Sequence, residues 1–191
     1  IFDIHTTSSI SSSSDYGRLR VELTGTTRQE SPFMVTYMSG TNGFANQSIG
    51  SSITTASIAD DSWHHYAFRF KNTGSNIVAD LFIDGAHNHR IQTGTTVDYV
   101  SGALVSTLGA LVTHPSGTTS PGFLPPLATR GWGKLSGSID EFRYWKTFRS
   151  SKKIQKYWFD QVGGGTNTDT SNSYLGVYYK FNEGITGNSS I

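Results

Sequence analysis

The segment WHHYAFRF, Trp63 to Phe70, is followed by the polar turn KNTGSN and then by IVADLFIDG, Ile77 to Gly85. Alternate residues of a strand point to opposite faces, and both runs carry apolar or aromatic side chains at alternating positions. The two runs predict a β-hairpin, and the pair Asp84-Gly85 predicts another tight turn after it. Because rings occur on both faces of Trp63 to Phe70, we predict a central strand that is covered on both sides.

Turn signals divide the rest of the chain into further strands and one helix. Strands are predicted at Arg18 to Leu23, Phe33 to Tyr37, Ala103 to Val112 and Lys134 to Trp145, with a Gly/Thr-rich turn at Thr24 to Thr27. A helix is predicted at Arg149 to Gln161, because Ser150 or Ser151 can cap its first turn and three apolar residues share one face. These three residues are Ile154, Tyr157 and Trp158.

The composition favours an all-β protein and excludes several classes of function. Gly, Ser and Thr together occupy 70 of the 191 positions, and these residues favour turns and strands over helices. A formal net charge of +1 gives no overall attraction to nucleic acid. The absence of cysteine excludes disulfides, thiolate zinc sites and a cysteine nucleophile. No run approaches the roughly 18 to 20 apolar residues of a membrane helix, so we expect no membrane insertion.

Three ordered blocks resemble the laminin-G-like, concanavalin A-like jelly-roll domains. The blocks are DDSWHHYAFRF, ADLFIDG and LSGSIDEFRYWKTFRSSKKI, and together they anchor roughly the span Gly17 to Trp158. They match the Trp-His-His strand of the family, its Asp-Gly hairpin partner, and its Gly-x-Ile-Asp-Glu closing strand with a short helix. The resemblance implies an antiparallel β-sandwich jelly roll with one short helix.

The expected domain organisation follows from this resemblance. Residues 1–162 are predicted to form the sandwich, and the Gly/Thr/Asn-rich stretch 163–173 a flexible linker. Residues 174–191 are predicted to be extended, and YYKFNEGITG resembles the opening strand of such domains, so a following domain can begin there. The chain starts with Ile1 rather than Met, and we expect a piece of a longer polypeptide whose earliest strand lies upstream.

The composition also resembles that of virion structural proteins of tailed bacteriophages, such as tail fibres, baseplates and capsid decoration. Secreted bacterial adhesins share it. This resemblance implies a virion or extracellular location, with a cell-surface or other polysaccharide and neighbouring virion or assembly subunits as partners. We therefore predict a surface-recognition or adhesion module, and a purely structural packing module is the alternative.

The Pro/Gly-rich stretch Thr113 to Gly133 holds four of the five prolines and is the predicted ligand-binding loop. Phe123 and Trp132 lie there with His114 and Arg130, and no strand pattern requires these rings. Rings with polar neighbours can bind the faces of sugars. They can equally pack against a neighbouring subunit or in the core, and the sequence leaves all three roles open.

Asp140, in the Ile-Asp-Glu strand, is the candidate metal ligand. In the family that this chain resembles, this aspartate often helps to hold a structural calcium ion. Calcium requires about 6 to 8 oxygen ligands, and a single carboxylate is identified here. The alternative is that Asp140 accepts hydrogen bonds from backbone groups near the start of the chain, and we favour this alternative.

A catalytic pair of carboxylates is not evident. Glycoside hydrolases need two carboxylates about 5–5.5 Å apart for retention or about 6.5–9.5 Å apart for inversion. Asp80 and Asp84 share a strand face but are separated by about 13 Å at the usual rise per residue. Asp140 and Glu141 are adjacent and point to opposite faces. We therefore predict that the protein is not an enzyme, with a glycoside hydrolase as the least favoured alternative.

The histidines provide a weaker metal hypothesis. His87 and His89 form His-x-His, which on a regular strand would direct two imidazoles to one side and could bind zinc with a third ligand. A polar strand end without metal explains the motif better. His64 and His65 are predicted to be strand residues, one of them a hydrogen-bonded core histidine.

Overall fold

The computed structural model describes residues 1–6, 15–28, 31–111, 133–160, 162 and 174–181. In these ranges the chain forms antiparallel β-sheets and one short helix, α1 (Ser151–Tyr157). The prediction of an all-β chain with one helix is confirmed. Within the same ranges, no helix has the length and apolar composition needed to cross a bilayer.

The largest sheet has five strands in the order β4-β3-β2-β1-β8. Its strands are β4 (Asn42–Ser48), β3 (Ser31–Ser39), β2 (Gly17–Arg28), β1 (Phe2–Thr6) and β8 (Leu104–Leu108). All four pairings are antiparallel, and β8 pairs with β1 although Thr6 and Leu104, the nearest ends of the two strands, are 98 positions apart in the sequence.

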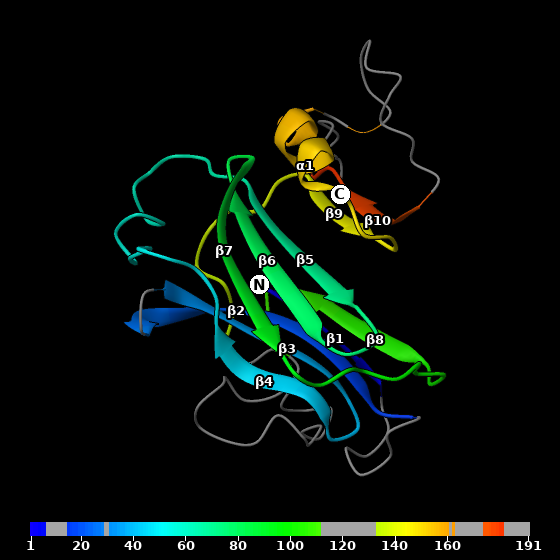
Figure 1. The fold of residues 1–191 in the computed structure, drawn as a ribbon. Helices are drawn as coiled ribbons and strands as arrows, with labels where there is room; N and C mark the ends of the chain where they lie inside the picture. Colours follow the sequence, from blue (N-terminus) through cyan, green and yellow to red (C-terminus); the bar gives the residue numbers. More distant parts are fainter. Residues whose placement is uncertain (7–14, 29–30, 112–132, 161, 163–173, 182–191) are drawn as a thin grey trace, which may run out of the picture.

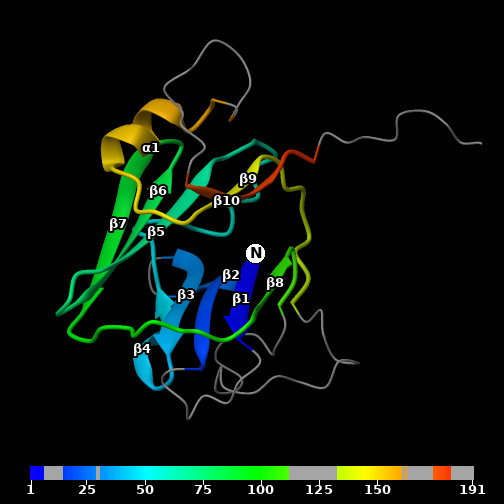
Figure 2. The ribbon, with the colours of Figure 1, turned by 90° about the vertical axis from the view of Figure 1, so that its right-hand side faces the viewer.

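The second layer contains a three-stranded sheet and a separate two-stranded ribbon (Figure 1). The three-stranded sheet has the order β5-β6-β7, with β5 (Tyr66–Asn72), β6 (Ile77–Ile83) and β7 (Ala86–Thr93). The ribbon consists of β9 (Phe142–Trp145) and β10 (Leu175–Tyr179), which pair antiparallel. In Figure 2 this ribbon lies above the edge of the large sheet that carries β1 and β8.

The core lies between the two larger sheets, which pack face to face. Alternate residues of β3 and β6 supply it, because period-two spacing places Phe33 and Val35 on one inner face and Ala79 and Leu81 on the other. The ring of Phe33 lies 5.0 Å from that of Tyr66 on β5. Fully buried apolar contacts across the two sheets therefore hold the sandwich together.

The outer face of the large sheet carries buried charges. Arg18, Arg20 and Glu22 alternate along β2 with the residues that face the core, and Asp3 lies opposite Arg20 on β1. Arg18 Nη2 lies 2.7 Å from Asp3 Oδ2, and Arg20 Nη2 lies 3.0 Å from Glu22 Oε1. Buried charges are tolerated when they are paired and hydrogen-bonded, which is the arrangement on this face.

The outer face of the three-stranded sheet is organised around Asp80. Its carboxylate accepts hydrogen bonds from Arg69 on β5 and from Arg90 and His87 on β7. Arg69 also donates to the carbonyl of Arg149 and to the hydroxyl of Ser151. One buried carboxylate therefore links three strands and, through Arg69, the start of α1.

The helix begins where the sequence predicts its cap. The Ser150 hydroxyl accepts a hydrogen bond from the amide of Lys153, and the apolar face of α1 buries Ile154 and Tyr157. The helix is shorter than predicted and ends at Tyr157. Trp158 follows as the C-cap and packs near His65, with ring centroids 5.9 Å apart.

The hairpin prediction is confirmed, but the predicted central strand is wrong. Among the described strands, β5 pairs only with β6, and it begins at Tyr66 rather than Trp63. The rings of β5, Tyr66, Phe68 and Phe70, all lie on one face, because the strand begins after Trp63 and His65. One face packs on the core, and on the other the Arg69 guanidinium lies 4.3 Å from the centre of the Phe148 ring.

Three other element boundaries differ from the predictions. The stretch Thr24 to Thr27 is not a turn: β2 continues to Arg28, which pairs with Ser31 after an irregularity in register. Strand β8 ends at Leu108, and β9 contains only the last part of the predicted strand Lys134 to Trp145. Isolated Gly and Thr residues are compatible with strand irregularities as well as with turns.

Candidate functional site

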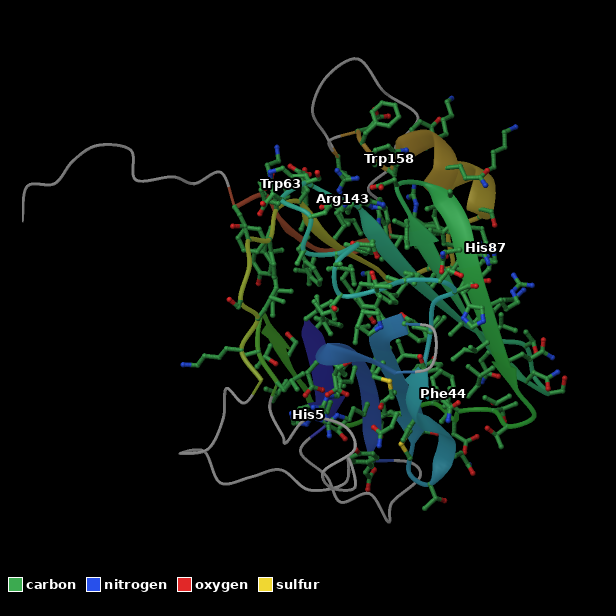
Figure 3. All side chains as sticks on the ribbon, turned by 90° about the vertical axis from the view of Figure 1, so that its left-hand side faces the viewer. His5, Phe44, Trp63, His87, Arg143 and Trp158 are labelled. Atoms are coloured by element: carbon green, nitrogen blue, oxygen red, sulfur yellow. The ribbon has the colours of Figure 1, made fainter. Side chains whose placement is uncertain are left out.

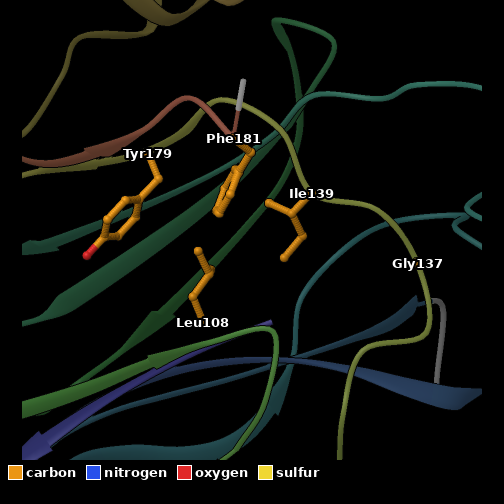
Figure 4. Close-up of a pocket in the computed structure, with 5 residues that line it drawn as sticks. All are labelled: Leu108, Gly137, Ile139, Tyr179 and Phe181. Atoms are coloured by element: carbon orange, nitrogen blue, oxygen red, sulfur yellow. The ribbon is translucent and has the colours of Figure 1, made fainter. Parts of the chain in front are cut away.

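An open hollow lies at one rim of the sandwich, between the β9–β10 ribbon and the end of β8 (Figure 4). It is a shallow surface depression rather than an enclosed cavity, with a volume of about 490 Å³. The lining residues come from three separate parts of the chain, and they are Leu108, Gly137, Ile139, Tyr179 and Phe181. We call this feature the rim hollow.

Backbone hydrogen bonds fix the floor of the rim hollow. The amide of Leu135 donates to the carbonyl of Gly109, and the amide of Gly109 donates to the carbonyl of Ile1, each at 2.8 Å. Gly109 has a φ of 76°, which glycine adopts easily. The turn after β8 is therefore tied both to β1 and to the segment that carries Ile139.

Aromatic rings form the other wall. The ring of Tyr179 stacks on that of Phe142 at 6.4 Å and 24°, and it lies 5.9 Å from that of Phe181. Phe142 in turn lies 5.3 Å from Phe2 on β1. Tyr179 is 52% exposed and Phe181 is 46% exposed. The wall is thus an exposed extension of an aromatic cluster that begins inside the sandwich.

Two residues at this rim have backbone conformations that are uncommon outside glycine. Phe181 has a φ of 53° and Glu141 a φ of 52°. The Glu141 carboxylate accepts hydrogen bonds from Arg143 and from the Tyr178 hydroxyl, which hold this turn in place. Such conformations tend to occur at functional sites, because surrounding contacts must maintain them.

The rim hollow is electrically neutral. Its described lining contains no charged side chain, and the Tyr179 hydroxyl is its one side-chain polar group. Asp140 follows Ile139 directly in the chain and is exposed. Lys180 lies between the lining residues Tyr179 and Phe181 in the chain, so residues of both charges flank the lining in the sequence.

Asp140 does not make the hydrogen bond that we predicted. Its Oδ1 accepts from the amide of the next residue, Glu141, at 2.9 Å, rather than from the start of the chain. Among the described residues, no three His, Asp or Glu side chains gather to hold a metal ion. A calcium ion at Asp140 would need its remaining oxygens from backbone groups or water, and it stays a prediction.

The other predicted site residues fall in a part of the chain that the structure does not describe. Phe123, Trp132, His114 and Arg130 all lie within 112–132, outside the described residues. The sequence interpretation missed Tyr179 and Phe181. A signal was present, because Val177, Tyr179 and Phe181 alternate at the spacing of one strand face.

His87 and His89 do not form a pair of metal ligands. A β-bulge between them places His87 opposite Phe82 and His89 opposite Leu81, so the two imidazoles lie on opposite faces of the sheet. His87 contacts Asp80, and His89 Nδ1 accepts a hydrogen bond from the amide of Gly50. The zinc hypothesis required both rings on one side.

His64 and His65 precede β5 and have opposite environments. The two ring nitrogens of His64 lie 2.8 Å from Asp84 and 3.0 Å from Asp60, and hydrogen bonds to these carboxylates raise the pKa of His64. Burial, together with nearby Arg143, lowers the pKa of His65 from 6.5 to about 4. Trp63 is 70% exposed beside them, at the same end of the molecule as Arg143 (Figure 3).

Comparison of the chain with protein-family models, curated proteins and solved structures gives no match.

Proposed function

We propose that this chain is a non-catalytic recognition module with a laminin-G-like jelly-roll fold, which binds a glycan and attaches a virion or another extracellular assembly to a surface. The observation that carries the proposal is the rim hollow, where two exposed rings stand beside an apolar floor. Aromatic rings pack well against the C–H face of a sugar, and such sites need few polar groups to orient the ligand.

Four carboxylates of the described residues are engaged by basic side chains, which supports binding rather than catalysis at these positions. Asp3 and Asp80 are each held by arginine side chains. Asp60 and Asp84 face each other, but the His64 ring lies between them and contacts both. A glycosidase needs the space between its two carboxylates for the scissile bond and a water molecule, so this pair lacks the necessary room.

A module of this kind gains strength from multiple copies. A single open hollow with one stacking wall gives a weak contact, and several copies on one particle would bind together with much greater avidity. Display of many copies on one assembly would therefore suit this module better than action as a single free lectin.

A structural packing module is the second candidate. Val177 shares a strand face with Tyr179 and is also exposed, so the apolar surface extends along β10 beyond the rim hollow. Tyr and Phe side chains in such patches also serve as anchors between subunits. In this case the rings would be covered by a neighbouring subunit and not by a sugar.

Glycan-array binding of the whole chain tests the proposal. We expect binding to at least one neutral glycan, and we expect Tyr179→Ala to weaken it by about tenfold, since one stacked ring is worth roughly 1–2 kcal/mol. Tyr99→Ala is the matched control, because Tyr99 is 88% exposed and is not among the residues that line the rim hollow.

The two candidates give different results. Loss of glycan binding in Tyr179→Ala but not in Tyr99→Ala supports recognition by the rings. If no glycan binds and Tyr179→Ala instead prevents self-association or particle assembly, the packing function is correct. Release of reducing ends from a polysaccharide would contradict both.

A further inference from the structure

We propose that the side of the molecule that carries α1 binds an acidic polysaccharide, at a site separate from the rim hollow. This side, which we call the basic face, has exposed cations on three elements: Lys71 on β5, Arg90 on β7, and Lys152, Lys153 and Lys156 on α1. None of these residues lines the rim hollow. A second surface with a second ligand goes beyond the proposed function.

Positive charge is concentrated in one short part of the sequence. Residues 142–159 contain six of the fifteen basic side chains and no Asp or Glu. The other nine basic residues and all fourteen acidic residues lie elsewhere, which leaves a formal charge of −5 on the rest of the chain. A local excess of one sign attracts a partner of opposite charge even when the whole chain is nearly neutral.

Helix α1 presents its lysines to solvent because its other face packs on the protein. Ile154 and Tyr157 are buried, whereas Lys152, Lys153 and Lys156 are exposed. Residues 152 and 156 are four positions apart and therefore lie on the same side of the helix. No carboxylate of the described residues forms an ion pair with Lys152 or Lys153. The charge of these two lysines is therefore not neutralised within the described part of the chain.

The basic face continues from α1 onto the three-stranded sheet, beside which the helix lies in Figures 1 and 2. Arg69 on β5 donates a hydrogen bond to the first residue of α1, and a Cβ at Gly85, after β6, would meet the ring of Trp158 at the other end of the helix. The helix therefore lies over the outer face of this sheet. Lys71 is two residues from Arg69 and shares its face, and Arg90 donates to the same carboxylate as Arg69.

The sheet adds more positive than negative charge to this face. Asp80 is the one acidic residue of strands β5, β6 and β7. Its carboxylate accepts hydrogen bonds from both Arg69 and Arg90. Two guanidinium groups on one carboxylate, together with exposed Lys71, leave a positive excess beside α1.

Other acidic residues lie at the edge of the basic face. Glu141 precedes the basic segment and is paired with Arg143. Asp84, in the turn that Trp158 contacts, is bound by the His64 ring. Asp160 follows the basic segment in the sequence. None of the three acids forms an ion pair with the first two lysines of α1.

A single flexible chain fits this distribution of charge better than a broad anionic surface. Because the rest of the molecule is acidic, a membrane or a nucleic acid duplex would also face regions that repel it. Exposed charges farther apart than about 8 Å are largely screened at physiological salt, so close contact determines the attraction. A polymer strand can lie along the basic face alone.

Among flexible polyanions, an acidic polysaccharide fits better than a single-stranded nucleic acid. Proteins that bind such strands stack successive bases on several open rings. Here the centre of the Phe148 ring lies 4.3 Å from the Arg69 guanidinium and 5.1 Å from Lys71 Nζ, which leaves Phe159, 68% exposed, as the most open ring of residues 142–159. The exposed cations are mostly lysines, which lack the planar fork of arginine, so binding depends on charge rather than on one type of anion.

Biolayer interferometry of the whole chain with dextran and carboxymethyl dextran, which share a backbone and differ in charge, tests the inference. We expect tighter binding to carboxymethyl dextran, with an affinity that falls as salt rises from about 0.01 M to about 0.15 M. The combined variant Lys152→Gln, Lys153→Gln and Lys156→Gln should weaken this binding about tenfold, because several exposed ion pairs are lost together. Gln and Lys have similar helix propensities, so α1 should remain folded.

Two controls separate charge on α1 from other effects of substitution. Arginine at the same three positions of α1 keeps the charge and should keep the binding. Lys134→Gln, at an exposed lysine outside the basic face, should change the affinity by less than about twofold.

Failure of this inference can be distinguished from failure of the proposed function. Tyr179→Ala should leave binding to carboxymethyl dextran unchanged, and the triple Gln variant should leave binding to a neutral glycan unchanged. Equal binding to the two dextrans, or an unchanged affinity in the triple Gln variant, overturns the basic face as the site. Tighter binding to a thymidine oligonucleotide, or to vesicles that contain phosphatidylserine, at equal concentration of anionic groups overturns the polysaccharide as the partner.

Discussion

Gly85, in the turn between β6 and β7, can be replaced by a larger residue only at a cost. Its φ is 78°, and a Cβ at this position would lie closer to Cδ1 of Trp158 than real side chains approach. Trp158 is the C-cap of α1, so this close approach brings the helix end against the hairpin. Both the backbone conformation and the space require glycine.

Gly85→Ala should destabilise the protein by about 2–4 kcal/mol, because strain and overpacking add. Gly74→Ala is the control: Gly74 has a φ of 89° but open space around it, so its replacement should cost only about 1 kcal/mol. Urea unfolding of the two variants measures both values. Equal costs would show that Trp158 does not press on this turn.

The buried His65 should lower the free energy of unfolding at acidic pH. Its pKa is about 4 in the folded chain and about 6.5 when unfolded, because burial and nearby Arg143 disfavour the charged ring. Between pH about 6.5 and 4 the unfolded chain therefore binds more protons, and stability falls as the pH falls, by on the order of 3 kcal/mol at most. His65→Phe should flatten this part of a plot of unfolding free energy against pH. An unchanged slope would contradict the buried, neutral ring.

His64 should have the opposite effect on the pH dependence of stability. Both of its nitrogens face carboxylate oxygens, so both hydrogen bonds form only when the ring is doubly protonated. The pKa of His64 is raised by the bonds to Asp84 and Asp60, so its contribution is complete below pH about 6.5 and is lost as the pH rises through the folded value. An NMR titration should give a pKa above 6.5, and Asp60→Asn should reduce it. A value at or below 6.5 in the unaltered chain would contradict the observed geometry.

Among the elements, the three-stranded sheet depends on one carboxylate. Burial opposes the charged form of Asp80, yet hydrogen bonds from Arg90, Arg69 and His87 lower the pKa of this residue overall. Asp80→Ala should cost about 3–5 kcal/mol, because it leaves the buried guanidinium of Arg69 without its anion. Asp61→Asn, at an exposed position whose φ of 60° asparagine also tolerates, should cost less than about 0.5 kcal/mol. A loss below about 1 kcal/mol in Asp80→Ala would mean that the pairing contributes little.

Local sequence patterns were enough to predict two of the elements. The β5–β6 hairpin follows from its alternating pattern and its polar turn, and α1 follows from the Ser150 cap. The central position predicted for β5 was wrong because the prediction began the strand at Trp63. The strand begins at Tyr66, and its rings then lie on the core face alone, as in an edge strand with one apolar face. The burial of Arg18 and Arg20 on β2 was not predictable either, because it depends on Asp3, which lies on another strand, β1.

For the whole molecule, the candidate site could not be assembled from the sequence. Leu108, Ile139 and Tyr179 are brought together by pairings between distant segments, β1 with β8 and β9 with β10. No local pattern specifies those pairings. The exposed rings of β10 were detectable as an alternation, but only the structure places them beside Ile139. The residues predicted for the ligand loop, 112–132, remain predictions.

The most direct measurement for the central claim is a crystal structure of the chain with the glycan that it binds best on the array. Our account predicts a sugar ring stacked on Tyr179 and an intact glycosidic bond. A glycan bound elsewhere with the rim hollow empty, or a cleaved bond flanked by two carboxylates, would contradict it.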